Sequence, residues 1–482
     1  MTERKLFVPR PWQEPMLEHI SQHDRCALWA GMGTGKTLPV LTLLEALYGV
    51  GGENAPTLIL GPLRVARKVW TDEARKWSHL SGLDIVPIIG SEKERLAALR
   101  YDAPVYTTNY ENLVWLIEHW GARWPYGTLI ADESDYIKGH RISFRTSTAG
   151  KEFLAGQGAK RAGALARIAH THVKRFVELT GTPAPNGLVD LWGQLWYLDR
   201  GRRLGRTFDS FKQRWFQKSY DGYGSVALPH AEAGIHAAVR DICLTIDGKD
   251  WFDLAAPVVN NVYVDLPVRA RKLYNEMEKE MFVQIEQQSA EAFNAAARTS
   301  KCLQISSGAC YVDPDVQSDD SPKAKQWAHV HDAKLDALES IVHETNGAPL
   351  LVCYEFRSDL ARLLKAFPKG RVLKTQQDED DFKAGKVPIL FLHPKSGGHG
   401  IDGFQYACNN IVFFGHSWNL GQYMQVIERI GPVRQMQAGF ERPVWVHHII
   451  ARDTVDELVM ERRETKRETQ DILLAACKRR KA

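Results

Sequence analysis

The chain has 482 residues, of which 44% are hydrophobic and 25% are charged, close to the average for soluble globular proteins. Because a domain holds roughly 100–200 residues, this length predicts two or three domains. No apolar run reaches the ~18 residues of a membrane-spanning helix, and the N-terminal MTERKLF lacks the apolar core of a signal peptide. The composition excludes a fibrous, disordered or membrane-spanning protein, and we expect a soluble intracellular monomer.

The net charge and the cysteines limit which ligands and cross-links we expect. The net charge is only +4, so contact with a nucleic acid would need a local basic track rather than overall charge. The seven cysteines are scattered and form no C-x-x-C pair, which argues against a disulfide framework and against a zinc site. We expect them to be small core residues.

Hydrophobic runs with strand propensity alternate with helical stretches in two parts of the chain. Such alternation is typical of a parallel sheet covered by helices. The first part contains six predicted strands, at residues 26–30, 57–61, 84–90, 104–108, 128–132 and 176–181. The second part contains five, at residues 349–356, 370–373, 388–393, 410–415 and 444–450. The sequence therefore predicts an α/β chain with two separate sheets.

The residues between these two parts have a different composition. Aromatic and basic residues at 202–224 precede a helical stretch at about 268–300 and a polar loop at 313–325. An irregular basic segment at 141–163 fits either a loop that contacts a polyanion or a solvated insertion. We expect four regions: an N-terminal lobe at 1–220, a linker and helical insertion at 221–330, a C-terminal lobe at 331–455, and a C-terminal helix with a basic tail at 456–482.

A glycine-rich loop follows the first predicted strand in the sequence CALWAGMGTGKT. Glycines allow backbone N–H groups to turn toward a phosphate, and the N-terminus of the next helix adds a favourable field for an anion. Lys36 would reach the β- and γ-phosphates of ATP, and the Thr37 hydroxyl would ligate Mg²⁺. Ala30 stands where the strict P-loop pattern has glycine, so the match depends on the residues nearer the helix. The predicted nucleotide-binding residues of this loop are Gly31, Met32, Gly33, Thr34, Gly35, Lys36 and Thr37.

An acidic strand end at 128–135, TLIADESD, provides the second half of a hydrolysis site. Asp132 would bind the metal, and Glu133 would orient or deprotonate the attacking water. The alternative is a carboxylate pair that only solvates a turn. Upstream, Gln13 in PRPWQ carries an amide that can both donate to and accept from an adenine edge, or it packs on the surface. We predict that Lys36, Asp132 and Glu133 are catalytic.

In chain order, these motifs resemble those of helicase superfamily two, and among its members the Swi/Snf-type DNA translocases. The resemblance runs from about residue 9 to residue 435. Its most specific stretch is LTGTPAPNGLVDLWGQLWYL at 179–198, which is similar to the family's L-T-G-T-P-x-x-N-x-x-x-x-L-W segment. DESDYIKG at 132–139 is similar to the DEAH-x-x-K-N box, with Ser134 and Asp135 in place of alanine and histidine.

The second half carries the remaining motifs of the family. KSGGHGIDGFQYACNNIVFFGHSWN at 395–419 is similar to a glycine-rich loop followed by a strand. QVIERIGPVRQ at 425–435 looks like Q-x-x-x-R-x-x-R-x-G-Q, but Pro432 occupies the position of the second arginine. The resemblance implies that Arg429 and Arg434 neutralise the transferring phosphoryl group, and it leaves open which of them is the arginine finger.

The resemblance assigns further residues to ligands. Thr180, Gly181 and Thr182 would connect the hydrolysis site to the rest of the motor, and Asn186 and Trp192 would fix the helices that follow. Gly400 and Asp402 join the predicted nucleotide-binding residues. The implied nucleic-acid track contains Pro62, Arg64, Thr108, Asn109, Ser396 and Gly397.

The resemblance therefore implies two RecA-like lobes with helical insertions, and a C-terminal helix that braces them. ATP and Mg²⁺ would bind between the lobes, and hydrolysis would move the chain along DNA, which we expect to be duplex and to be bound without sequence preference. Two alternatives stay open: a strand-separating DNA or RNA helicase, and an ATP-regulated clamp or recruitment factor for a protein partner. The compact length, without a chromatin or zinc module, favours a bacterial or viral source.

Overall fold

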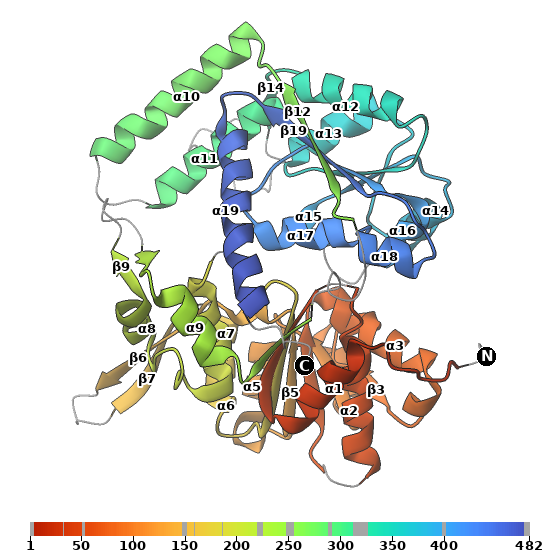
Figure 1. Ribbon diagram of the computed structural model, residues 1–482, viewed down its shortest axis with the longest axis vertical. Coiled ribbons are helices and arrows are strands. Elements are labelled where there is room, and N and C mark those ends of the chain that lie inside the picture. The colour runs from red at the N-terminus through yellow and green to blue at the C-terminus, as the bar shows by residue number, and fades with distance from the viewer. Residues whose placement is uncertain are drawn as a thin grey trace. The chain divides into compact units, whose positions relative to one another are not determined.

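Two parallel sheets organise the chain in the computed structural model (Figure 1). The residues form two compact units, Met1–Asp253 with Lys466–Ala482, and Leu254–Thr465. The structure describes residues 4–31, 33–50, 54–146, 152–158, 160–185, 187–218, 225–246, 255–287, 292–311, 326–397 and 402–476.

The sheet of the first unit has seven strands among the described residues, all parallel, in the order β11-β1-β8-β5-β2-β4-β3. Most of these strands are buried along nearly their whole length, as expected for a sheet that is covered on both faces. The strands are β1 (Arg25–Ala30), β2 (Thr57–Gly61), β3 (Ile85–Pro87), β4 (Val105–Asn109), β5 (Thr128–Asp132), β8 (Arg175–Thr180) and β11 (Cys243–Ile246).

Alternate residues of these strands enter two different cores, because successive side chains of a strand point to opposite faces. Leu58 and Leu60 of β2 lie in one core, and Ile59 lies in the other. The Ile59 core is covered by α1 (Gln13–Gln22), α2 (Thr37–Gly49) and α3 (Trp70–Lys76). The opposite core is covered by α5 (Leu113–Trp120), α6 (Lys160–Ile168), α7 (Val189–Asp199), α8 (Phe208–Trp215) and α9 (Ala231–Val239).

Shorter elements complete the first unit. Within the segment that we predicted to be irregular, β6 (His140–Thr146) and β7 (Glu152–Gly158) pair antiparallel. The strands β9 (Phe216–Lys218) and β10 (Ser225–Ala227) form a second antiparallel pair. Helix α4 (Glu92–Ala98) is preceded by its N-cap residue Ser91, whose hydroxyl accepts a hydrogen bond from the backbone N–H of Glu94.

The sheet of the second unit has six strands among the described residues, all parallel, in the order β12-β19-β18-β15-β17-β16. Its strands are β12 (Val258–Val264), β15 (Leu350–Cys353), β16 (Arg371–Val372), β17 (Ile389–Leu392), β18 (Asn410–Phe413) and β19 (Trp445–Ala451). One face is covered by α12 (Ala333–Glu344) and α13 (Arg357–Ala366). The other face is covered by α14 (Gln376–Lys383), α16 (Phe404–Ala407) and α17 (Leu420–Glu428).

A third group of elements in the second unit packs around the start of the last helix. Tyr274 of α10 (Val268–Gln287) and Leu303 of α11 (Ala292–Ser307) are buried with Val455 and Val459 of α19 (Val455–Ala476). The remaining elements are β13 (Ala309–Tyr311), β14 (Trp327–His329), α15 (Pro394–Gly397) and α18 (Pro432–Gln437). Figure 1 shows α10 and α11 in green and α19 in blue.

The predicted α/β class, with two parallel sheets covered by helices, is confirmed. None of the helices in the described part of the chain combines the length and the apolar character needed to cross a membrane.

Candidate nucleotide site

The glycine-rich loop connects the end of β1, at Ala30, to the start of α2, at Thr37. Gly33 and Gly35 have φ angles of 80° and 75°, in the left-handed region that glycine tolerates without strain. A Cβ atom at Gly35 would lie 2.9 Å from the side-chain nitrogen of Gln13. The loop therefore needs glycine here for its backbone conformation and for the close approach of Gln13. The first backbone N–H groups of α2 face the end of this loop, an arrangement suited to a phosphate.

The side chains of Trp12 and Gln13 hold the outer part of the loop. The Trp12 Nε1 donates to the Thr34 carbonyl at 2.8 Å, and the Gln13 Nε2 donates to the Gly35 carbonyl at 3.2 Å. The Gln13 Oε1 accepts from the backbone N–H of Arg10 at 3.0 Å. The predicted adenine contact of Gln13 stays a prediction, and in this structure its amide shapes the phosphate loop.

Two polar side chains of the loop also bond to the loop itself. The Thr34 hydroxyl donates to the Gly31 carbonyl at 2.6 Å, and the Lys36 Nζ donates to the Ala30 carbonyl at 2.9 Å. Met32 lies outside the described residues. The Lys36 ammonium thus lies at the carboxyl end of β1. A phosphate bound on the loop could replace the Ala30 carbonyl as the hydrogen-bond acceptor of Lys36.

The acidic turn, defined here as residues 132–138, follows β5. Asp132 and Glu133 are both buried, and Glu133 has φ 57° and ψ 61°, a left-handed conformation that is uncommon for glutamate. The buried hydroxyl of Tyr110 donates to the Asp132 carbonyl at 2.8 Å, and the Glu133 carbonyl lies 3.4 Å from the same hydroxyl. Surrounding contacts therefore hold a strained carboxylate residue in a fixed position, a feature often found at functional sites.

Burial raises the pKa of Asp132 to about 7; the neighbouring Glu133 raises it as well, and the positive charge of Lys36 opposes the shift. Two buried carboxylates side by side need a cation to remain ionised. Hard oxygen donors such as Asp132 and the Thr37 hydroxyl are the ligands that Mg²⁺ prefers. The donor set thus fits the predicted metal, which these two residues would hold together with the phosphates of the nucleotide.

The loop and the acidic turn meet at one edge of the sheet. Strand β8 lies between β1 and β5, with Trp29 opposite Thr180 and Leu179 opposite Asp132. The carboxyl ends of all three strands are therefore level. Ligands of open parallel sheets bind beyond these ends. The structure brings together the predicted residues Lys36 and Asp132, and the Lys36 charge acts on the Asp132 carboxyl.

Helix α7 packs directly against the acidic turn. The Ser134 hydroxyl donates to the Gln194 Oε1 at 2.8 Å, and the Gln194 Nε2 donates to the Pro183 carbonyl at 2.6 Å. The Lys138 ammonium forms an ion pair with Asp190 at 3.3 Å. Through Gln194, the turn that carries Glu133 is connected to the loop that follows β8.

The loop after β8 is the segment that most resembled the family pattern. The backbone N–H of Thr182 donates to the Thr180 hydroxyl at 3.0 Å, which closes a tight turn at the strand end. The Trp192 Nε1 donates to the Gly205 carbonyl at 2.7 Å and ties α7 to the segment before α8. Asn186 lies outside the described residues.

Four predicted nucleic-acid residues follow two neighbouring strands. In the register of β2 and β4, Gly61 lies opposite Asn109, so Pro62 and Asn109 meet at the carboxyl edge of the sheet. Arg64 precedes the short helix Val65–Val69. The Thr108 hydroxyl donates to the Ile88 carbonyl at 2.8 Å, and the Asn109 Nδ2 donates to Glu111 at 2.8 Å. Their contact with a nucleic acid stays a prediction.

In the second unit, the predicted arginines lie on either side of a helix break. Arg429 is buried at the end of α17, and Arg434 lies in α18. Pro432 is the first residue of α18, a position where proline lacks only an N–H that has no helical partner anyway. The Arg434 guanidinium forms an ion pair with Asp402, so two of the predicted residues contact each other. Ser396 and Gly397 end α15, and Gly400 lies outside the described residues.

Comparison with known proteins identifies the family. The model of the SNF2-related domain matches residues 14–310, which is more than half of the chain. The chain belongs to the SNF2-related domain family. Protein p41 of Acyrthosiphon pisum secondary endosymbiont phage 1 is 50% identical over 484 residues, which cover 99% of this chain and all of that protein. The predicted place among Swi/Snf-type ATPases of helicase superfamily two is confirmed.

More distant SNF2 relatives are longer proteins. The mouse SWI/SNF-related matrix-associated actin-dependent regulator of chromatin subfamily A member 1 is 22% identical over 92% of this chain and 41% of its own length. An uncharacterised ATP-dependent helicase of Mycoplasma genitalium is 24% identical over 91% of this chain and 39% of its own. The SWI2/SNF2 ATPase core of Sulfolobus solfataricus, solved in complex with dsDNA, gives a TM-score of 0.43 at 20% identity, over 97% of this chain and 93% of that one.

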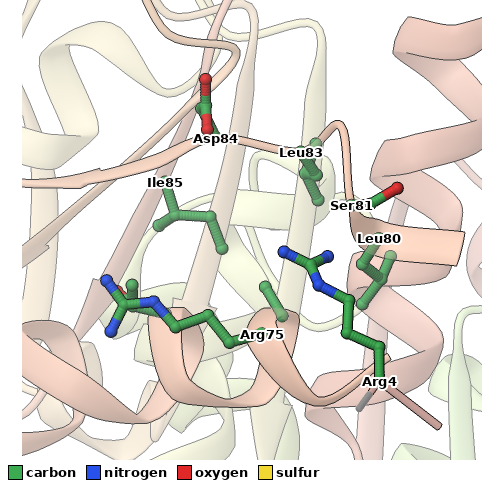
Figure 2. Close-up of a pocket in the computed structure, with 9 residues that line it drawn as sticks. Arg4, Arg75, Leu80, Ser81, Leu83, Asp84 and Ile85 are labelled. Atoms are coloured by element: carbon green, nitrogen blue, oxygen red, sulfur yellow. The ribbon is translucent and has the colours of Figure 1, made fainter. Parts of the chain in front are cut away.

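A small pocket elsewhere in the first unit of this SNF2 chain is separate from the site. It has a volume of about 150 Å³ and lies between the N-terminal segment, α3 and β3. Figure 2 shows Arg4, Arg75 and Asp84 among the residues that line it. None of the predicted nucleotide or nucleic-acid residues lines this pocket.

Sequence reasoning missed Tyr110 and Gln194, which hold the acidic turn. Gln194 had a signal: it is a lone amide in the apolar run LWGQLWYL of a helix, and a buried amide needs hydrogen-bond partners. Tyr110 lies in the sequence VYTTNYENL at 105–113, which is similar to the family's Thr/Ser-Tyr-Glu strand end, but this similarity assigned it no contact with the acidic turn.

Proposed function

We propose that this chain binds ATP with Mg²⁺ at the carboxyl edge of its first sheet, hydrolyses it, and uses the reaction to translocate on duplex DNA. The observation that carries the proposal is the meeting of Lys36, at the start of α2, with the buried Asp132 and Glu133 at the end of β5. Membership of the SNF2-related domain family supports it.

The chain's own residues have distinct tasks in this proposal. The phosphate loop and Lys36 bind the phosphates, and Thr37 and Asp132 hold the metal, which supplies Lewis-acid stabilisation of phosphate charge when it is bound. Glu133 orients the attacking water or takes its proton. The contacts of Tyr110 and Gln194 keep Glu133 in its left-handed conformation, so that the carboxylate is preorganised.

Of the two arginines, we propose Arg429 as the one that neutralises charge on the transferring phosphoryl group. Arg429 occupies an arginine position of the family pattern, whereas Arg434 stands two residues beyond the position that Pro432 takes. Arg429 is buried at a helix end, where its backbone is fixed. We expect Arg429→Ala to lower kcat by at least ~10³-fold relative to wild type. Arg434→Ala should lower kcat by less.

The choice of duplex DNA as the track is supported by family membership and by the placement of Pro62, Arg64 and Asn109 after strands of the sheet that carries the nucleotide site. Contacts of strand-end loops with phosphates carry no sequence information, so binding should be independent of sequence and weaken with salt. The relatives named for chromatin regulation are consistent with this choice.

The hydrolysis site is tested with Lys36→Ala and Glu133→Gln, measured as phosphate release with saturating DNA. The matched controls are Lys93→Ala and Glu118→Gln, two exposed positions on α4 and α5. We expect loss of turnover in the first pair, because it removes phosphate binding or water activation, and wild-type rates in the second. Wild-type hydrolysis by either Lys36→Ala or Glu133→Gln would refute the site.

The track is tested with a panel of nucleic acids. We expect duplex DNA to stimulate ATP hydrolysis more than single-stranded DNA or RNA, and a triplex to be displaced while a plain duplex stays paired. Stronger stimulation by single-stranded RNA, or strand separation, would favour a helicase. Hydrolysis that no nucleic acid stimulates would favour an ATP-regulated clamp for a protein partner.

A further inference from the structure

Arg463 in α19 is a buried cation outside the site described above, and it contacts the segment that leads into α17. Its side chain is 5% exposed. The Arg463 Nη2 donates to the Ser417 carbonyl at 2.9 Å. A buried guanidinium is costly to desolvate, so its contacts must compensate for that cost. These contacts indicate what the residue does.

His416, the residue before Ser417, accepts a second hydrogen bond from Arg463. The His416 Nε2 lies 2.8 Å from the Ile449 carbonyl, which requires a proton on that nitrogen. Burial lowers the pKa of His416 to about 3, so the ring is neutral and its Nδ1 carries a lone pair. This Nδ1 lies 3.4 Å from the Arg463 Nη1, which donates to it. Arg463 therefore holds the segment 416–417 at two points.

Arg463 also contacts α17 directly. Its guanidinium carbon lies 4.5 Å from the centre of the Tyr423 ring, within cation–π distance. The Tyr423 hydroxyl is 3.1 Å from the Nε2 of His448 in β19, so the ring cannot rotate away freely. The Asn419 side chain caps the helix start by accepting from the Gln422 N–H at 3.0 Å. The first turn of α17 is thus fixed by α19, β19 and its own cap.

The end of the same short helix carries Arg429. Because α17 spans only Leu420–Glu428, a shift or rotation of its first turn moves Arg429 with it. A displacement of about 1 Å at a catalytic group can cost on the order of 100-fold in rate.

We propose that Arg463 is a positioning residue, which sets the place of Arg429 by clamping the segment 416–417 and the Tyr423 ring. This inference rests on the proposed role of Arg429 in hydrolysis. It assigns to the first turns of α19 a task in catalysis that does not require them to touch the nucleotide.

The test is a double-mutant cycle between Arg463→Met and Arg429→Ala, with Arg269→Met as the matched control. Methionine fills the volume without a charge, and Arg269 is an exposed arginine on α10 of the same unit. Phosphate release is measured on the full-length chain with duplex DNA, under single-turnover conditions for slow variants. Melting temperature, KM for ATP and affinity for DNA are recorded in parallel.

We expect Arg463→Met to lower kcat by on the order of 10- to 100-fold, with KM for ATP and DNA affinity within about twofold of wild type. In the Arg429→Ala background the same change should have less than about threefold effect, because a misplaced arginine costs nothing once it is absent. Tyr423→Leu should reproduce the pattern, and Arg269→Met should behave as wild type.

Equal losses in both backgrounds would overturn the proposal, because a general loss of structure acts independently of Arg429. If Arg463→Met does not fold, Arg463→Lys serves in its place, since it keeps the charge but loses the paired donors and the stacking. Wild-type turnover by Arg429→Ala alone would refute the arginine assignment instead. If Arg429→Ala loses activity but the effects of Arg463→Met and Arg429→Ala add in the double variant, only the positioning role of Arg463 is refuted.

Discussion

The substitution Gly193→Ala tests how closely α7 packs on the acidic turn. A Cβ atom at Gly193 would lie 2.0 Å from the carbonyl oxygen of Lys138 and 2.6 Å from its carbonyl carbon. Both are backbone atoms, so no side-chain rotation relieves the overlap, and α7 or the turn must move. Overpacking of this kind costs typically about 1–3 kcal/mol. Alanine in a helix interior otherwise stabilises by about 1 kcal/mol over glycine.

The control is Gly163→Ala in α6, where a Cβ would meet nothing within 4 Å. This variant should gain up to ~1 kcal/mol. Chemical denaturation followed by tryptophan fluorescence should thus separate the two variants by roughly 1–3 kcal/mol, with Gly193→Ala the less stable. Because Lys138 belongs to the same turn as Glu133, Gly193→Ala should also lower ATP turnover by ~10-fold or more. Equal stability and full activity of both variants would refute the inferred close packing.

Three further predictions concern buried polar groups. Both oxygens of Glu178 are buried without a partner in the described part of the chain, and burial, then Asp199, raises its pKa. The folded state holds this proton while the unfolded state releases it, so stability falls as pH rises above about 4.3. In urea titrations above this pH, the free energy of unfolding of the wild type should fall by up to ~1.4 kcal/mol per pH unit relative to that of Glu178→Gln. Parallel pH profiles of the two proteins would contradict this. Lys334→Met should lower the free energy of unfolding by about 3–5 kcal/mol in the same assay, because it leaves the fully buried Asp456, its ion-pair partner at 2.6 Å, without a counter-charge. Adding Asp456→Asn should restore part of this loss. Ser134→Ala and Gln194→Leu should each cost about 1–3 kcal/mol, and their costs should not add in the double variant; full additivity would show that their hydrogen bond is not the source.

The central strands of both sheets are buried, and sequence patterns predicted all of them; of the edge strands, β3 and β16 lie within predicted runs. Runs such as 57–61 and 128–132 are continuous apolar stretches, and both form central strands with the same bounds. The strands β11 and β12, at Cys243–Ile246 and Val258–Val264, were not predicted. Both are edge strands of their sheets. The first is short, and the second contains two asparagines and is largely exposed or half-buried, so neither shows the apolar run of a central strand.

The phosphate loop illustrates what the sequence determined by itself. Its glycines, Lys36 and Thr37 act through local geometry, between a buried strand and the helix that follows it, and such geometry is encoded by neighbouring residues. The acidic residues at the end of β5 were identified for the same reason. Family membership follows from the same local motifs in their order.

Only the tertiary structure decided which distant side chains hold these motifs in place. Gln13 lies 22 residues from Gly35, and Ser134 lies 60 residues from Gln194, yet each pair is joined by a hydrogen bond. Arg463 reaches Tyr423 from a different helix. Hydrophobic periodicity shows which face of a helix is buried but not which element it meets or at which residue. The partners of a buried polar side chain therefore emerge only when the helices pack on their sheet.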